Sequence, residues 1–204
     1  KGELSQEELT KVEDKVITEL VEKQIANGLK GVTDGEFRRA YWHLDFFWGL
    51  NGVEHTQAKI GYQFHDETTK PDSADVVAKI TGEGHPFVAH YKFLRDLVGD
   101  RAEVKQTIPA PAQFYFELIR DEEHIAQTYS VYESKEELFA DIIKAYKQVI
   151  KEHYEAGCRV IQLDDCTWGA IVDDRLIKLI AEGSGLNPEG IREAFIKDFI
   201  TLNN

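Results

Sequence analysis

The strongest constraint on the fold of this chain is an order of local patterns that repeats: an amphipathic helix, a glycine and then a short strand. Two of the helices open on capping boxes, with Ser5 or Ser134 at the N-cap and a glutamate three residues later. The predicted pairs of helix and strand cover 5–28 with 30–33, 86–99 with 103–107, and 134–157 with 159–163. Helices that alternate with strands through short glycine turns predict an α/β fold with parallel strands.

Two further patterns extend this prediction. Residues 57–64 and 75–81 alternate in polarity, and the polar loop between them indicates a β-hairpin inserted into the α/β fold. A last helix begins at Asn187 and Pro188 and runs almost to the end of the chain, so we expect a strand to follow it. No linker or low-complexity run interrupts residues 1–204, which predicts a single domain.

The ends of the predicted strands carry the residues that are capable of chemistry. Each strand ends in an acidic residue or a Pro-bounded turn, and the loops there contain Trp, His and Asn. No GxGxxG or GxxxxGK[ST] motif follows a strand, which disfavours the common nucleotide-binding folds. We therefore expect a (β/α)8 TIM barrel that is incomplete here, without its first strand and its C-terminal strands. The absence of methionine also indicates a piece of a longer protein.

Composition excludes several classes of protein. No segment approaches the run of about 20 apolar residues that a membrane span requires, and no signal peptide pattern opens the chain, so we expect a soluble protein. A formal net charge of −13 without a block of Lys or Arg disfavours binding to nucleic acid. The two cysteines form no CxxC pair, which is typical of a reducing, cytoplasmic setting.

Asp34, Gly35 and Glu36 follow the first predicted strand. Glycine allows a sharp turn there, which would present the Glu36 carboxylate at the barrel mouth, where it could bind a cationic group such as an ammonium. The same residue types also suit an ion pair between Glu36 and Arg38 or Arg39. The position at a strand end favours the functional interpretation.

Asp164 and Asp165 end the strand predicted at 159–163. Adjacent residues of a strand point to opposite faces, so Asp164 shares a face with Gln162, and Asp165 lies on the other face. Asp165 could instead cap the following turn or helix. The aromatic segment 41–52, which follows the first predicted strand, contains Trp42 and His43. Its rings could form a stacking surface for a flat ligand, or the segment could be a loop packed on its own rings.

Metal ligation has little support in the residue spacing. The seven histidines form no HxH, HxxxH or HxC pattern of the kind that a zinc site uses. Cys158 is expected in the core at the start of a strand, and Cys166 lies next to the Asp pair. We expect no metal ligand within this chain.

Several motifs, taken in order along the chain, resemble the cobalamin-independent methionine synthases, in particular the shorter, single-barrel bacterial proteins of that family. The motifs are VTDGEFRR at 32–39, WHLDFFWGLNGVE at 42–54, GYQFH at 61–65, QTIPAPAQF at 106–114 and CRVIQLDDCTWG at 158–169.

The resemblance implies a barrel that transfers a methyl group from 5-methyltetrahydrofolate to the thiol of homocysteine, with zinc holding the thiol as a thiolate. It implies that Glu36 and Asp164 contact the amino group of homocysteine. Further candidate contacts of substrate or folate are Trp42, His43, Gln113, Phe114, Tyr115, Asp165 and Trp168. The family's second acidic position is Glu, and a Pro follows it, whereas this chain has Asp165 and Cys166.

The zinc ligands of the family would follow the last residues of this chain, so zinc is implied without a ligand among residues 1–204. One alternative keeps the fold and changes the substrate to another thiol or the donor to a methylated corrinoid. Others are a decarboxylase of the uroporphyrinogen type, which would need basic residues at the mouth, and a non-catalytic binding module. Residue patterns leave the oligomeric state open.

Overall fold

The structure is a computed structural model that describes residues 4–63 and 65–204. Its strands are β1 (Gly31–Val32), β2 (Asn51–Gln57), β3 (Asp72–Thr81), β4 (Glu103–Pro109) and β5 (Val160–Asp164). Its helices are α1 (Gln6–Ala26), α2 (Leu44–Phe47), α3 (Pro86–Val98), the 3-10 turn η1 (Gly99–Arg101), α4 (Pro111–Leu118), α5 (Glu122–Val131), α6 (Lys135–Glu155), α7 (Thr167–Val172), α8 (Asp174–Ser184) and α9 (Pro188–Asn203).

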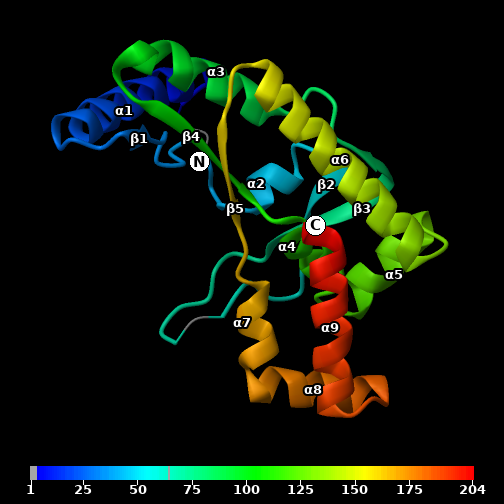
Figure 1. The fold of residues 1–204 in the computed structure, drawn as a ribbon. Helices are drawn as coiled ribbons and strands as arrows, with labels where there is room; N and C mark the ends of the chain where they lie inside the picture. Colours follow the sequence, from blue (N-terminus) through cyan, green and yellow to red (C-terminus); the bar gives the residue numbers. More distant parts are fainter. Residues whose placement is uncertain (1–3, 64) are drawn as a thin grey trace.

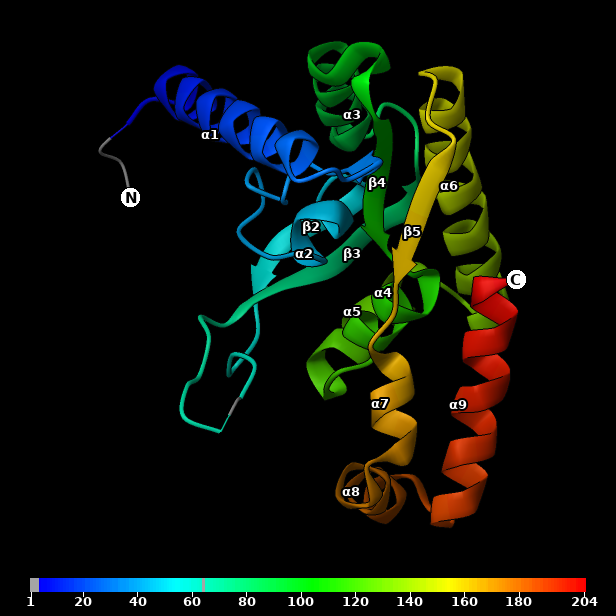
Figure 2. The same cartoon turned by 60° about the vertical axis from the view of Figure 1, so that its left-hand side comes forward.

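Three strands form a parallel sheet in the order β1, β4, β5, which confirms the predicted α/β class. Val32 is paired with Val104 at one side of β4, and Pro109 is paired with Asp164 at the other. Figure 2 shows β4 and β5 side by side, running in the same direction toward α4 and α7. The carboxyl ends of the strands therefore meet at one edge of the sheet.

Amphipathic helices cover this sheet because their apolar faces need a partner. Ile17 and Val21 of α1 pack with Tyr91, Leu94 and Val98 of α3 around Val32 and Val104. A larger core gathers apolar residues of α4, α6, the β2/β3 hairpin and α2, including Leu44, Phe46, Phe47, Phe114 and Ile142. Strand β4 contributes to both cores, with Val104 in the first and Ile108 in the second.

The helix starts follow the predicted capping chemistry. The Ser5 hydroxyl accepts a hydrogen bond from the Glu8 backbone, and the Glu8 carboxylate accepts one from the Ser5 backbone, as a capping box requires. The Ser134 hydroxyl caps α6 by accepting a hydrogen bond from the Glu137 backbone at 3.2 Å. Asn187 caps α9 by accepting one from the Gly190 backbone at 2.7 Å. These local bonds explain why the predicted helix starts are right.

The predicted hairpin exists, but its first strand was placed wrongly. That strand is β2 at Asn51–Gln57, not 57–64, and it pairs antiparallel with β3. Buried Val53 faces Val76 across the pair, whereas Ile60 is 54% exposed, so core packing selects the earlier segment. Gly52 (φ 82°) lies against backbone carbonyls of β3 and makes this close approach possible. Phe64, the last residue of the predicted strand, lies outside the described residues.

Several elements escape the sequence patterns. The aromatic segment contains a single helical turn, α2, whose Leu44, Phe46 and Phe47 are buried. Helix α4 begins at Pro111, two residues after β4 ends at Pro109, because proline suits the first turn of a helix. Helices α7, α8 and α9 project beyond the sheet edge, and α9 returns beside α4 (Figures 1 and 2).

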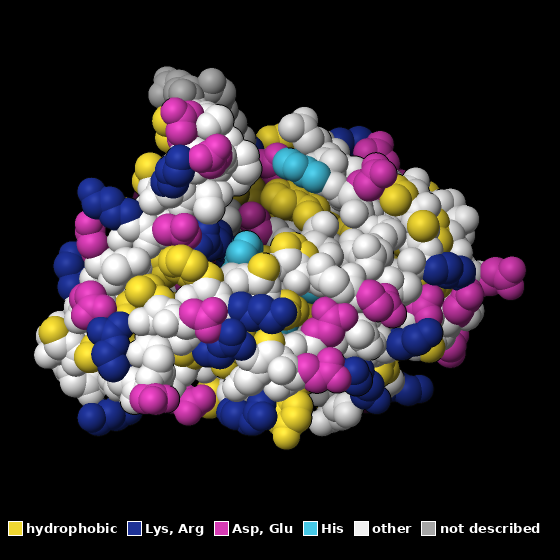
Figure 3. Space-filling model, turned by 90° about the horizontal axis from the view of Figure 1, so that it is seen from above, with side chains coloured by type: hydrophobic (Ala, Val, Ile, Leu, Met, Phe, Trp, Pro, Cys, Tyr) yellow, Lys and Arg dark blue, Asp and Glu magenta, His cyan; other side chains and the backbone are white. Residues whose placement is uncertain are grey.

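The parallel sheet is open in the part of the chain that the structure describes, and barrel closure stays a prediction. No described helix is long and apolar enough to cross a membrane. Acidic and basic side chains alternate over the face seen in Figure 3, so the net charge of −13 is not gathered in one patch there.

Phe47 offers a direct test of this packing. It is fully buried, with its ring centroid 4.6 Å from that of Phe114, and Phe47→Ala should lower the free energy of unfolding by about 3–5 kcal/mol through the cavity it leaves. The control is Phe37→Ala, because Phe37 is 47% exposed and should lose less than about 1 kcal/mol. Urea unfolding measures both. Equal losses would contradict the assignment of α2 to the core.

Candidate functional site

The turn after β1 has an unusual backbone. Gly35 and Glu36 both have positive φ, at 66° and 61°. Among the described residues, Glu36 is the one non-glycine residue with a positive φ. The Asp34 carboxylate accepts a hydrogen bond from the Glu36 backbone at 2.9 Å, and the Gln24 side chain bonds both backbone groups of Thr33. A left-handed glutamate costs about 1–2 kcal/mol, so the surrounding contacts must hold it.

The Glu36 carboxylate is held by the neighbouring strand and by an arginine. Its Oε1 accepts a hydrogen bond from the Thr107 hydroxyl at 2.7 Å and pairs with Nη1 of Arg39 at 3.1 Å. The predicted alternative of an ion pair is therefore present for Arg39. Arg38 pairs instead with Glu13 and Asp14 of α1.

The end of β5 supplies the second acidic group. The Gln162 side chain donates a hydrogen bond to Asp164 Oδ1, which confirms that the two residues share a face of the strand. The Asp165 carboxylate accepts from the backbone and hydroxyl of Thr167 and from Asn203 at 2.8 Å. The expected alternative for Asp165, stabilisation of the turn into the next helix, is thus also present.

These groups meet at an open hollow of about 340 Å³. It is lined by Glu36, Trp42, Asp164, Asp165 and Cys166. The residues come from the turn after β1, the aromatic segment and the end of β5, so the parallel sheet brings together segments that are more than a hundred positions apart. Three of the five residues are acidic and none is basic, which suits a positively charged group.

Cys166 lies at the edge of this hollow. Its Sγ is 2.9 Å from Oε1 of Gln113, to which the thiol donates a hydrogen bond. Burial raises the pKa of the Cys166 thiol, and the Asp165 carboxylate raises it further. The thiol is therefore protonated at neutral pH and acts here as a hydrogen-bond donor rather than as a nucleophile.

The other candidate contacts lie at different depths. Gln113 is buried and reaches the hollow through its bond to Cys166. Phe114 and Tyr115 point into the core, where they pack on Phe47 and Phe139. Trp168 is 42% exposed and packs edge-on against a ring of α9. The structure thus places Trp42, but neither Phe114 nor Tyr115, at the hollow.

His43 lies behind Trp42, with their ring centroids 4.7 Å apart. Its Nε2 is 2.9 Å from the Tyr62 hydroxyl, which donates to the buried Glu117 carboxylate at 2.5 Å, so Nε2 must be the protonated nitrogen. Burial lowers the pKa of His43 to about 4, against opposing attraction from Glu117. The neutral imidazole therefore holds Tyr62 in place and supports the wall that Trp42 forms.

Thr107 and Arg39 are the site residues that the motifs did not single out as functional. Thr107 ends the strand predicted at 103–107, so its position at the active edge was available as a signal. For Arg39 the sequence predicts only an ion pair with Glu36. Its contact with Thr107 joins residues 68 positions apart, and no local pattern contains that information.

A metal ion does not fit the described residues. Among residues 4–63 and 65–204, no group of three or more His, Cys, Asp and Glu side chains converges as a metal site would require. The zinc implied by the family resemblance has no ligand set here.

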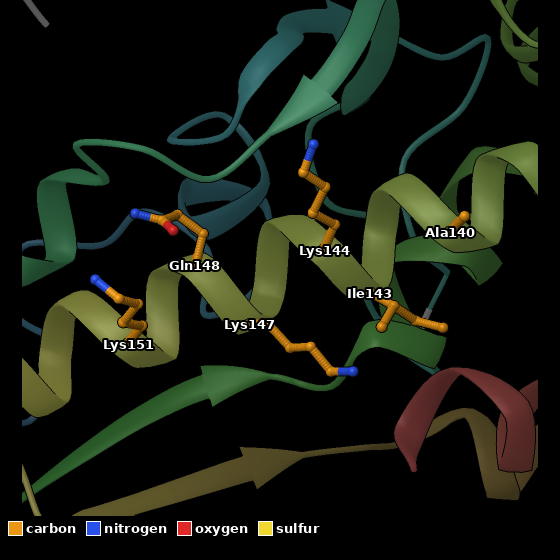
Figure 4. A pocket seen from close by; sticks show the side chains of 6 residues that line it. All are labelled: Ala140, Ile143, Lys144, Lys147, Gln148 and Lys151. Carbon is orange, nitrogen blue, oxygen red and sulfur yellow. The ribbon is translucent and has the colours of Figure 1, made fainter.

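A second hollow lies on the outer surface of α6. Figure 4 shows Lys144, Lys147 and Lys151 around it, together with Ala140, Ile143 and Gln148. All six belong to one helix, and Lys151 is paired with Glu155 at 2.6 Å. This surface lacks residues from other elements that could position a ligand.

Comparisons with known proteins agree with the motif analysis. Two Bacillus subtilis proteins, the uncharacterized proteins YxjH and YxjG, are 40% and 38% identical to this chain over 203 and 196 residues, which is 100% and 96% of the chain but 51% and 50% of theirs. The chain therefore spans about half the length of these relatives. No protein-family model matches it.

Two solved structures share the fold. One is a Listeria monocytogenes protein assigned as a vitamin-B12-independent methionine synthase, with a TM-score of 0.67, 33% identity, and coverage of 98% of this chain and 53% of that one. The other is a B12-independent methionine synthase from Shewanella sp. W3-18-1 in complex with selenomethionine, with a TM-score of 0.57, 25% identity, and coverage of 79% and 43%. The resemblance inferred from the motifs is therefore confirmed.

The turn that presents Glu36 can be tested through its glycine. A Cβ at Gly35 would lie 2.5 Å from Leu20 Cδ2, whereas a Cβ at Gly28 would meet nothing within 4 Å, although both glycines have positive φ. Gly28→Ala should cost about 1 kcal/mol of unfolding free energy for the backbone alone. Gly35→Ala should cost about 1 kcal/mol more, at the low end for overpacking, because only the terminal methyl of the half-buried Leu20 must shift. Denaturant titration compares them, and equal losses would contradict this crowding.

His43 predicts a pH dependence of stability. The unfolded chain protonates this histidine near pH 6.5 and the folded chain only near pH 4, so the free energy of unfolding should fall as pH drops between these values. His43→Gln should reduce this slope by up to about 1.4 kcal/mol per pH unit, while buried His85 keeps its own contribution. The control is His65→Gln, whose side chain is 96% exposed. An unchanged slope in His43→Gln would contradict a buried neutral imidazole.

Proposed function

We propose that this chain, a relative in sequence and fold of the cobalamin-independent methionine synthases, is part of a methyltransferase that acts in methionine biosynthesis. The proposed reaction moves a methyl group from 5-methyltetrahydrofolate to the thiol of homocysteine. Within it, this chain binds the amino group of homocysteine through Glu36 and Asp164.

The observation that carries this proposal is the meeting of these two carboxylates at one hollow from the ends of different strands. Glu36 Oε1 and Asp164 Oδ1 accept hydrogen bonds from protein groups. Glu36 Oε2 accepts no hydrogen bond from the residues that the structure describes. An ammonium has three donors and no acceptor, so two carboxylates on one side of it give charge-assisted bonds that a neutral or anionic group could not form.

The negative charge of the hollow favours a substrate with an ammonium group over one with several carboxylates. A decarboxylase of the uroporphyrinogen type must bind several substrate carboxylates, which calls for Lys or Arg at the mouth. The residues around this hollow are Glu36, Asp164 and Asp165 with Trp42 and Cys166, so such a substrate would meet repulsion. An amino acid bound by its ammonium is the better match.

Trp42 supports a place for the methyl donor. Its indole forms a wall of the hollow and is backed by His43 and the Tyr62 hydroxyl, which limits its freedom to turn. A flat, weakly polar ring system such as a pterin can stack on a held indole. Gln113 is buried behind Cys166 and accepts a hydrogen bond from its thiol, and its proposed role is to support this side of the hollow.

Zinc enters the proposal only through residues outside this chain. When bound, zinc would hold the homocysteine thiol as a thiolate, the form that accepts a methyl group. The described residues have no ligand set for it, and they contribute orientation of the amino acid instead.

The proposal predicts a loss of homocysteine affinity in Glu36→Gln and Asp164→Asn. Each change removes a charge-assisted hydrogen bond, so affinity should fall at least about tenfold in the longest natural polypeptide that contains this chain. Isothermal titration calorimetry measures the binding. The control is Glu54→Gln, an exposed carboxylate on β2 that lies away from the hollow.

Unchanged affinity in both site variants would overturn the assignment of the ammonium site. The donor is tested separately by assaying methyl transfer with 5-methyltetrahydrofolate against a methylated corrinoid. Transfer from the corrinoid alone would replace the folate part of the proposal and leave the ammonium site standing.

A further inference from the structure

We propose that Arg39 is a positioning residue that holds the Glu36 carboxylate and the Trp42 segment as one rigid unit, and so sets the preference of the site for an amino-bearing substrate. The inference rests on the proposed function, because it concerns how the same hollow recognises its ligand. Arg39 is separated from Glu36 by three positions and is almost completely buried, with 3% of its side chain exposed.

The guanidinium of Arg39 contacts three segments of the chain. Nη1 lies 3.1 Å from Glu36 Oε1 and donates to the Trp42 carbonyl at 3.2 Å. Nη2 donates to the Thr107 carbonyl at 2.7 Å and lies 3.2 Å from the Thr107 hydroxyl. Because Thr107 itself donates to Glu36, the three residues form a closed set of contacts around one carboxylate oxygen.

A planar guanidinium is required for this arrangement. Its face covers the ring of Phe87, with the central carbon 4.4 Å from the ring centroid, while its edge carries donors toward three different acceptors. A lysine ammonium has three donors on a flexible stem and cannot stack in this way. Burial lowers the pKa of Arg39, and the carboxylates of Glu36, Asp34, Asp45 and Asp164 raise it again. The buried charge therefore persists in the midst of these acids.

The contacts explain how Glu36 keeps a left-handed backbone. The conformation costs free energy, and the ion pair with Arg39 and the hydrogen bond from Thr107 offset that cost in the folded protein. Both contacts involve Oε1, which orients the carboxylate about that oxygen. The other oxygen, Oε2, is then the one presented to a ligand, at a fixed distance from the Trp42 wall.

Arg38 provides a matched control. It is the preceding residue, has 8% of its side chain exposed, pairs with Glu13 and Asp14, and stacks on Phe93 at 4.9 Å. Its loss should therefore destabilise the fold in the same way as the loss of Arg39, because each substitution removes a largely buried guanidinium that pairs with a carboxylate and stacks on an aromatic ring. No described contact joins the Arg38 side chain to Glu36, Thr107 or Trp42.

The experiment compares two ligands in the longest natural polypeptide that contains this chain. Homocysteine carries the amino group, and 4-mercaptobutyrate is the same thiol acid without it. Calorimetry gives the affinity ratio of the two for wild type, Arg39→Met, Arg39→Lys, Arg38→Met and Glu36→Gln, and urea unfolding checks that each variant is folded.

In Arg39→Met the preference for homocysteine should fall at least about tenfold, to the level of Glu36→Gln, while the affinity for 4-mercaptobutyrate changes less than about threefold. Arg39→Lys should recover part of the preference, because it keeps a charge near Glu36. Arg38→Met should keep the wild-type ratio. A purely structural role would lower stability in both methionine variants and move the ratio in neither, and that result would overturn the proposal.

If wild type binds neither ligand, the proposed function fails, and Arg39 is then judged by crystal structures of wild type and Arg39→Met, which removes every polar contact of the guanidinium. The positioning role predicts that Glu36 leaves the left-handed region or that its carboxylate leaves Thr107. A Glu36 that stays in place in the variant would overturn the inference by itself.

Discussion

Parallel pairing of β1, β4 and β5 is the constraint on which the rest of this molecule depends. In a parallel sheet the strands end at the same edge, so the residues that follow them become neighbours although they are far apart in the chain. Glu36 follows β1, Thr107 lies near the end of β4, and Asp164 ends β5. The hollow between the acids is a consequence of that pairing. Helices α1 and α3 pack on the sheet and bury its apolar residues.

Two sets of buried polar contacts stabilise the conformation of the site. Arg39 joins the turn after β1, the aromatic segment and β4 through one guanidinium, and this joint supports a backbone conformation that glutamate rarely adopts. Behind Trp42, a second buried network runs from His43 through Tyr62 to Glu117, which also accepts from Ser73 of β3 at 2.6 Å. The inserted hairpin and α4 are therefore joined to the wall of the hollow by hydrogen bonds as well as by apolar contact.

Much of the fold was predictable because its signals are local. Capping residues, glycine turns and helical periodicity place α1, α3, α6 and α9 within a residue or two, and the short segments that follow the glycine turns mark the parallel strands. The predicted first strand of the hairpin is wrong because 57–64 alternates in polarity and Asn51–Gln57, with Val53 as its one strongly apolar residue, does not. The pairing of Val53 with Val76 in the core decides between them, and such a pairing has no local signature.

The candidate site also has features that local sequence patterns predict and features that only tertiary contacts decide. The sequence by itself determined the α/β class, the acidic residues at strand ends and the family motifs, since each depends on residue types at short spacing. Only the tertiary structure decided that Phe114 and Tyr115 enter the core while Trp42 borders the hollow, and that Arg39, not Arg38, pairs with Glu36. Those outcomes depend on which distant surfaces meet on folding, because burial and ion pairing are settled by contacts between elements and not within them.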